Sequence, residues 1–168
     1  MKVILIGFMG VGKTTVGRQL AKKMNLEFID MDKEIEKREE RSISKIFKEN
    51  GELYFRQTET LILKELLKRN DILISTGGGI VTIEENYKIL KKEKNVIFLD
   101  ANTNTILKHL SNETHKRPLL ANSNNKEKTI SELLEARYDK YNGVSDIKID
   151  VNQKNVEEVV SQILVYIN

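Results

Sequence analysis

The stretch Gly7-Phe8-Met9-Gly10-Val11-Gly12-Lys13-Thr14 decides the fold of this chain. It follows an apolar run at residues 3–6 and opens a helix-like run at residues 15–21. A strand, a glycine-rich turn and a helix with the spacing G-x-x-x-x-G-K-[ST] are typical of a phosphate-binding loop, or P-loop. Its glycines let backbone N–H groups converge on phosphate oxygens, and the helix directs its positive dipole end at the same anion. The alternative is a plain glycine turn with a surface lysine, but the order of elements favours binding of a nucleoside triphosphate.

Two side chains of this loop carry the expected chemistry. Lys13 can reach the β- and γ-phosphates, and the Thr14 hydroxyl can ligate Mg²⁺. We expect the phosphates to be bound by consecutive residues of the loop and the first helical turn, namely Gly10, Val11, Gly12, Lys13, Thr14 and Thr15. This half of the site binds a phosphate donor, so the remaining question is what accepts the phosphate.

Composition limits the classes of protein to which the chain can belong. Its 168 residues fit one domain, residues 1–168. We expect neither a transmembrane helix nor a signal peptide, because the apolar runs are short, and the absence of cysteine excludes disulfides and thiolate chemistry. The 28 basic residues are interleaved with 25 acidic ones, so the net charge of +3 does not indicate nucleic acid or membrane as a partner. A cytoplasmic protein is expected.

Short apolar runs alternate with helical patterns along the whole chain. The runs typical of strands lie at residues 3–6, 26–29, 72–74, 96–99 and 147–151. This alternation predicts an α/β fold of three layers, with a parallel sheet flanked by helices on both faces. Ligands of such sheets bind beyond the carboxyl ends of the strands.

Polar motifs follow two of these predicted strands. Asp30-Met31-Asp32 ends the second, and Gly77-Gly78-Gly79 follows the third. We expect Asp30 to lie on the Mg²⁺ side, since no acidic residue ends the third strand, and Asp32 to accept a proton from an attacking hydroxyl. The alternative for Asp32 is that it caps the following helix. The triple glycine indicates close approach of a ligand to the main chain, or otherwise an ordinary loop.

Three arginines are candidates for binding anions. Arg56 and Glu59 are spaced i, i+3 and can pair on one helix face, either as a surface salt bridge or as a steadied anion-binding group. Arg137 is a solvated helix residue or a substrate ligand. Arg117 precedes the sole proline within residues 111–124, which we interpret as a mobile surface segment that could close as a lid. His109 and His115 are interpreted as surface residues.

Together these motifs resemble the shikimate kinase family in order and spacing over nearly the whole chain. The resemblance implies a P-loop kinase fold with a five-stranded parallel sheet, a lid at about residues 111–124 and a helical substrate-binding region at about residues 31–60. It also implies transfer of phosphate from ATP, with Mg²⁺, to the 3-hydroxyl of shikimate in the route to chorismate and the aromatic amino acids. A monomer is expected.

The resemblance also implies roles for single residues. Lys13, Asp32 and Arg117 are the expected catalytic residues, and Arg117 reaches the nucleotide from the lid. The substrate-binding set is Asp32, Arg56, Gly78, Gly79 and Arg137, and the metal-side set is Thr14 and Asp30. Phe47 and Phe55 are expected as apolar walls of the acceptor pocket.

The chain departs from the family pattern at two places. Tyr138-Asp139-Lys140 lacks the proline that many members carry shortly after the arginine matching Arg137. Lys108-His109-Leu110 stands where members often have an arginine against the adenine, which leaves Asn152 and Gln153 as candidates for contacting the base. The alternative functions are a kinase of another small polyol acid, such as gluconate, and a non-catalytic nucleotide-binding protein.

Overall fold

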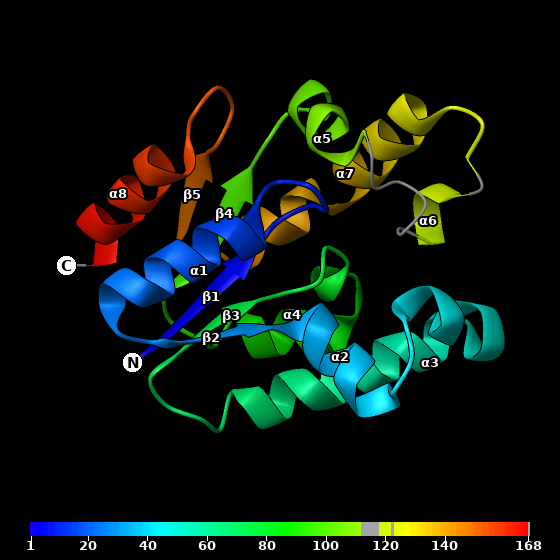
Figure 1. Ribbon diagram of the computed structural model, residues 1–168, viewed down its shortest axis with the longest axis horizontal. Helices are drawn as coiled ribbons and strands as arrows, with labels where there is room; N and C mark the ends of the chain where they lie inside the picture. Colours follow the sequence, from blue (N-terminus) through cyan, green and yellow to red (C-terminus); the bar gives the residue numbers. More distant parts are fainter. Residues whose placement is uncertain (112–117, 122, 168) are drawn as a thin grey trace.

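The computed structural model describes residues 1–111, 118–121 and 123–167. Its centre is a sheet of five parallel strands in the order β2-β3-β1-β4-β5 (Figure 1). The strands are β1 (Lys2–Ile6), β2 (Glu27–Asp30), β3 (Ile72–Ser75), β4 (Val96–Asp100) and β5 (Ile147–Asp150). All five predicted strands are confirmed, each within a residue or two of its predicted ends, and so is the parallel α/β fold.

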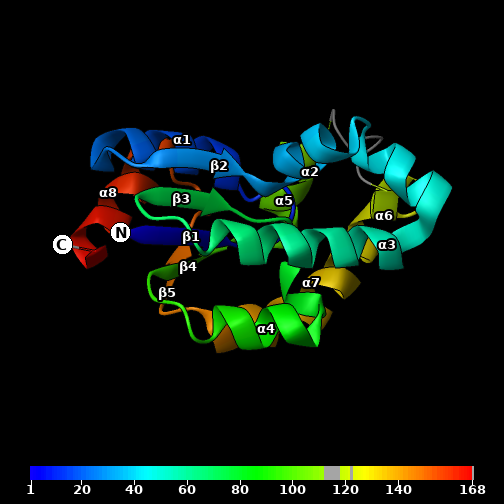
Figure 2. The same cartoon turned by 90° about the horizontal axis from the view of Figure 1, so that it is seen from below.

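Helices cover both faces of the sheet, as the alternating pattern predicts. Figure 2 shows α1 (Lys13–Met24) on one face and α4 (Glu84–Leu90) on the other. Helix α8 (Val156–Ile167) packs beside α1, and α7 (Lys126–Val144) packs on the face of α4 together with the short helix η1 (Ile80–Thr82). Helix α5 (Thr103–Leu110) lies against α7. The central strands are therefore buried on both sides, which explains why they read as continuous apolar runs.

Close packing of α1 on the sheet depends on Gly17. A Cβ atom at this position would lie 2.6 Å from the Phe28 ring and 3.1 Å from Leu73. The glycine therefore lets the first helix sit directly on β2 and β3. This contact holds the start of α1, and with it the P-loop, over the middle of the sheet.

Strand register brings the functional ends of three strands together. Asp30 on β2 lies opposite Ser75 on β3, and Ser75 lies opposite Leu5 on β1. Because all strands are parallel, the turns that follow β1, β2 and β3 emerge at one edge. The sheet thus presents the P-loop, the two aspartates and the triple glycine side by side.

The helical region after β2 differs in one respect from its predicted form. Helix α2 (Met31–Glu39) and the start of α3 (Ile43–Leu66) lie at the end of the molecule away from the two termini, and α3 then runs back until its C-cap Leu67 accepts a hydrogen bond from Lys2 Nζ (Figure 1). Helix α3 is broken at Gly51, whose φ of 80° and ψ of 173° are not helical. The break separates Phe47 from Phe55 on the chain, yet their rings lie 4.9 Å apart between centroids.

Half of the predicted lid lies outside the part of the chain that the structure describes. Residues 112–117 and 122, including Arg117, are not described. Residues Pro118–Ala121 form the short helix α6, which contacts both α3 and α7.

Candidate active site

The P-loop encloses the ammonium group of Lys13. Gly12, with a φ of 95°, occupies the left-handed region and forms the N-cap of α1, so the chain turns sharply into the helix. Lys13 is buried, and its Nζ donates hydrogen bonds to the carbonyl oxygens of Gly7 at 2.7 Å and Phe8 at 2.8 Å. The positive charge is thereby held inside the loop, where phosphate oxygens would enter.

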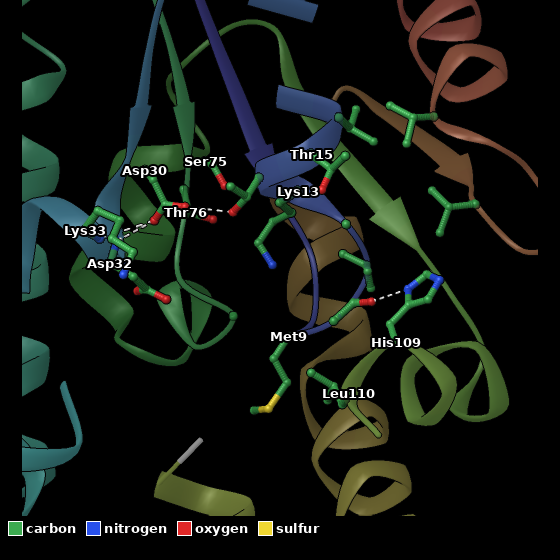
Figure 3. Close-up of a pocket in the computed structure, with 18 of the residues that line it drawn as sticks. Met9, Lys13, Thr15, Asp30, Asp32, Lys33, Ser75, Thr76, His109 and Leu110 are labelled. Atoms are coloured by element: carbon green, nitrogen blue, oxygen red, sulfur yellow. Dashed lines mark hydrogen bonds between the residues drawn. The ribbon is translucent and has the colours of Figure 1, made fainter. Parts of the chain in front are cut away.

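A cavity of about 1070 Å³ opens from this loop (Figure 3). It is lined by all six residues that we expect to bind the phosphates and by Asp30 and Asp32. It is also lined by Val151, Lys154, Asn155 and His109. Gln153 is not among the lining residues, whereas its two successors on the chain are.

Thr14 and Asp30 meet across the P-loop. The Thr14 hydroxyl donates a hydrogen bond to Asp30 Oδ2 at 2.7 Å, while Asp30 Oδ1 accepts from the backbone N–H groups of Asp32 and Lys33. Asp30 is therefore the N-cap of α2, and Asp32 lies in the first turn of that helix. The capping role considered for Asp32 belongs to Asp30.

The residues present fit a Mg²⁺ ion. Thr14 and Asp30 offer two neighbouring oxygen donors at the rim of the phosphate cavity. Among the described residues no group of three or more acidic or histidine side chains gathers to hold a metal by itself. This sparse set suits Mg²⁺, which keeps several waters and takes further oxygens from a bound nucleotide.

A second pocket adjoins the first beside the triple glycine. Met9, Asp32, Ile43 and Gly78 line both cavities, so the two cavities adjoin at these residues. The further walls of the second pocket come from α3, α7, the glycine turn and α6, and are Phe47, Phe55, Arg56, Glu59, Gly77, Gly79, Pro118, Leu119 and Arg137. All five residues expected to bind the acceptor thus line one pocket.

Three ionisable side chains are buried at this second pocket. Arg56, Glu59 and Arg137 are 6%, 0% and 5% exposed. Arg56 Nη1 donates to Glu59 Oε2 at 3.0 Å, so the surface salt bridge considered for this pair is instead a buried one. Glu59 Oε1 and Arg137 Nη1 are buried without a hydrogen-bond partner. Arg56 also pairs with the half-exposed Glu52, so Arg137 Nη1 is the buried guanidinium atom that a carboxylate ligand would pair.

Burial also changes the acidity of Glu59. Loss of hydration raises the pKa of its carboxyl group to about 7, even though the neighbouring Arg56 favours the charged form. Asp32 adds to the rise, since both carboxyl groups face Gly77, where a Cβ atom would lie 2.6 Å from Glu59 Oε1 and 3.1 Å from Asp32 Oδ1. Folding therefore holds Glu59 near its point of half-protonation at neutral pH.

Glycine is required in the turn after β3 because side chains crowd it. A Cβ atom at Gly79 would collide with the Arg56 guanidinium group, and one at Gly77 would lie 2.6 Å from Glu59 Oε1. The crowding comes from protein side chains, and the close approach of a ligand to this turn stays a prediction.

Sequence reasoning missed two residues of the site. Tyr141 is fully buried, stacks on Phe98 and donates its hydroxyl proton to the Gly78 carbonyl, and burial raises the pKa of that hydroxyl to about 12. Its spacing of four from Arg137, on one helix face, was the available signal. His109 is exposed, as predicted, but its Nδ1 lies 2.6 Å from the Gly10 carbonyl oxygen of the P-loop.

Comparison with known proteins identifies the family. A family model described as shikimate kinase matches residues 9–168. The chain belongs to the shikimate kinase family. A shikimate kinase from Alkaliphilus oremlandii is 43% identical over 162 residues, which cover 96% of this chain and 96% of that protein. The family resemblance seen in the motifs is thereby confirmed.

Solved structures give the same result for the fold. The structure of shikimate kinase from Acinetobacter baumannii in complex with shikimate is 37% identical, with a TM-score of 0.94, over 99% of this chain and 92% of that one. A gluconokinase from Sinorhizobium meliloti, 16% identical with a TM-score of 0.59 over 98% and 89% of the chains, shares the fold alone. The predicted P-loop kinase fold is confirmed.

Proposed function

We propose that this member of the shikimate kinase family transfers the γ-phosphate of ATP to the 3-hydroxyl of shikimate, giving shikimate 3-phosphate and ADP. The observation that carries the proposal is the pair of adjoining cavities. One surrounds the P-loop, and the other places two buried arginines and Asp32 directly beside it. A small ring acid with hydroxyl groups matches this set, because its carboxylate can pair with the arginines while one of its hydroxyl groups faces the phosphate donor.

The acceptor is held by charge and shape. Arg56, steadied by Glu59, and Arg137, whose Nη1 has no protein partner, bind the carboxylate of the acid. Gly78 and Gly79 let the ring approach the main chain, and Phe47 and Phe55 supply the apolar wall. Fixing the ring at one end orients the reacting oxygen at the other, which converts binding energy into rate.

Transfer then needs a proton acceptor and neutralisation of charge. The acceptor hydroxyl oxygen forms a bond to the γ-phosphorus, the bond to the bridging oxygen of ADP breaks, and Asp32 takes the hydroxyl proton. Lys13 neutralises negative charge on the β- and γ-phosphates. Thr14 and Asp30 would hold Mg²⁺, which supplies further neutralisation and orients the phosphates when bound. Arg117, on the predicted lid at residues 111–124, adds a further positive charge and helps to exclude water.

One assay tests the function. The purified chain is given ATP and Mg²⁺ with shikimate, gluconate or a nucleoside monophosphate, and ADP release is measured. We expect release that depends on shikimate and is lost in Lys13→Met, which shows that the activity belongs to this chain. Release with gluconate alone would favour the polyol alternative, and release with none of them would favour a non-catalytic nucleotide-binding protein.

The setting of the activity is part of the same proposal. No helix in the described part of the chain is long and apolar enough to cross a membrane. We place the enzyme in the cytoplasm as a monomer of one domain, with residues 31–60 as the acceptor-binding region.

A further inference from the structure

The last turn of α5 contacts the middle of the P-loop. His109 Nδ1 lies 2.6 Å from the Gly10 carbonyl oxygen, and the adjacent Leu110 packs against Gly10 so closely that a Cβ there would lie 2.8 Å from Leu110 Cγ. Both contacts join residues about a hundred positions apart in sequence. They fall on a glycine with a φ of 79°, a left-handed conformation that glycine adopts without a Cβ clash.

The chemistry of this contact assigns its direction. A carbonyl oxygen only accepts hydrogen bonds, so the Nδ1 atom of His109 carries the proton and donates it. In Figure 3 the His109 ring and the Lys13 side chain lie on opposite sides of the loop. The Gly10 carbonyl oxygen therefore points away from the side of the loop on which the Lys13 side chain lies.

The orientation of the Gly10 carbonyl also fixes the orientation of the next backbone N–H group. The Gly10 carbonyl and the Val11 N–H belong to one planar trans peptide unit, in which C=O and N–H point in opposite directions. Holding the oxygen toward His109 turns the Val11 N–H the opposite way, toward the side of the loop on which Lys13 lies, and both Val11 and Lys13 line the phosphate cavity. A peptide next to a glycine would otherwise rotate with little hindrance, and an N–H turned outward would no longer serve phosphate oxygens.

We propose that His109 is a positioning residue, which fixes the Gly10–Val11 peptide so that the Val11 N–H is ready to bind the nucleotide phosphates. The inference rests on the proposed ATP-dependent function and adds a residue to it. His109 touches the loop and not the reacting atoms, so its effect is on nucleotide affinity. Pre-orientation of a donor before binding removes a cost that each binding event would otherwise carry.

Three substitutions at one position test the proposal. His109→Ala removes the donor, His109→Phe keeps an aromatic ring without a donor, and His109→Asn keeps an N–H near the position of Nδ1. The affinity for ADP is measured by calorimetry, together with KM for ATP and KM for shikimate. Asn104→Ala, an exposed change on the same helix, is the matched control.

We expect Ala and Phe to weaken ADP binding by about 3- to 10-fold, the loss typical of one hydrogen bond, and to raise KM for ATP equally. The ADP affinity of His109→Asn should stay within about twofold of that of the wild type, and KM for shikimate should be unchanged in all variants. Normal ADP affinity in the Phe variant, or equal loss in Asn and Ala, would overturn the proposal. Wild-type turnover with shikimate tests the proposed function separately, so the two failures can be told apart.

Discussion

The hydrogen bond from the Thr14 hydroxyl to Asp30 Oδ2, 2.7 Å long, joins the P-loop to the N-terminus of α2. Since Asp30 Oδ1 caps that helix, one carboxylate serves both the local structure and the donor site. The two roles have different chemical requirements. Capping needs a side-chain oxygen, whereas holding Mg²⁺ near phosphates is best done by a negative charge.

Two substitutions of Asp30 should therefore separate stability from turnover. Asp30→Asn keeps a good N-cap, so the free energy of unfolding in urea should change by less than about 0.5 kcal/mol, while kcat falls at least about tenfold. Asp30→Ala should lose activity as well and also about 1 kcal/mol of stability. Equal destabilisation by both substitutions would contradict this division.

The buried Glu59 should make stability depend on pH. Its pKa is 4.5 without the protein environment and about 7 in the fold. Because the folded value is the higher one, its contribution to stability is complete below about pH 4.5 and is lost as the pH rises toward 7. We expect the free energy of unfolding of the wild type to fall by about 2 to 3 kcal/mol over this range relative to Glu59→Gln.

A neighbouring glutamate supplies the control for this experiment. Glu52 also pairs with Arg56, at 3.3 Å, but its side chain is half exposed. Urea denaturation of Glu52→Gln should give the pH dependence of the wild type. If Glu59→Gln and the wild type follow the same pH curve, Glu59 is ionised in both folded and unfolded states and the prediction is wrong.

Arg137 should act on the acceptor and not on the nucleotide. Arg137→Ala removes a buried cation that would bind the substrate carboxylate, so KM for shikimate should rise by about 10- to 100-fold, while calorimetry finds ADP affinity within about twofold of the wild type. Lys140→Ala, exposed on the same helix, should change neither. A loss of ADP affinity in a folded Arg137→Ala variant would show that Arg137 acts on the nucleotide, which contradicts the prediction.

Asn86 offers a prediction outside the site. Its side chain on α4 is fully buried, and neither its amide nitrogen nor its oxygen has a hydrogen-bond partner. Asn86→Leu, of similar volume, should raise the free energy of unfolding by about 1 kcal/mol with unchanged kcat, because an unpaired buried amide is costly. Thermal unfolding measures the change, and a lower midpoint would show that an internal partner, such as a water molecule, satisfies the amide.

The parts of the fold that could be predicted are those encoded by contiguous residues. The strands are short apolar runs, and the P-loop specifies strand, turn and helix within a dozen positions. The break at Gly51 could not be predicted, because a single glycine within a helical pattern is often tolerated. The sequence left Asp32 as a candidate for the cap of α2, because an aspartate before a helical pattern is a good N-cap. The structure shows that the helix begins at Met31, directly after β2, so the cap is Asp30.

The site divides in the same way. The donor residues follow from one motif, and the acceptor residues from their order along the chain. His109 and Tyr141 escaped prediction because each acts on a backbone carbonyl far away in sequence, at Gly10 and Gly78. A contact with main-chain atoms leaves no requirement on the residue type of its partner, so the sequence gives no signal for the His109 contact and only the helical spacing from Arg137 for Tyr141.

The residues that line both cavities have a consequence for the design of inhibitors. Because Met9, Asp32, Ile43 and Gly78 line both cavities, the nucleotide and acid subsites are close enough for one molecule to be designed for both. Linking two weak fragments across this junction makes the second binding event intramolecular, with a gain in affinity of about 10²-fold or more for a linker of matching length. A short, rigid bisubstrate compound would thus bind both subsites at once, which neither ligand does alone.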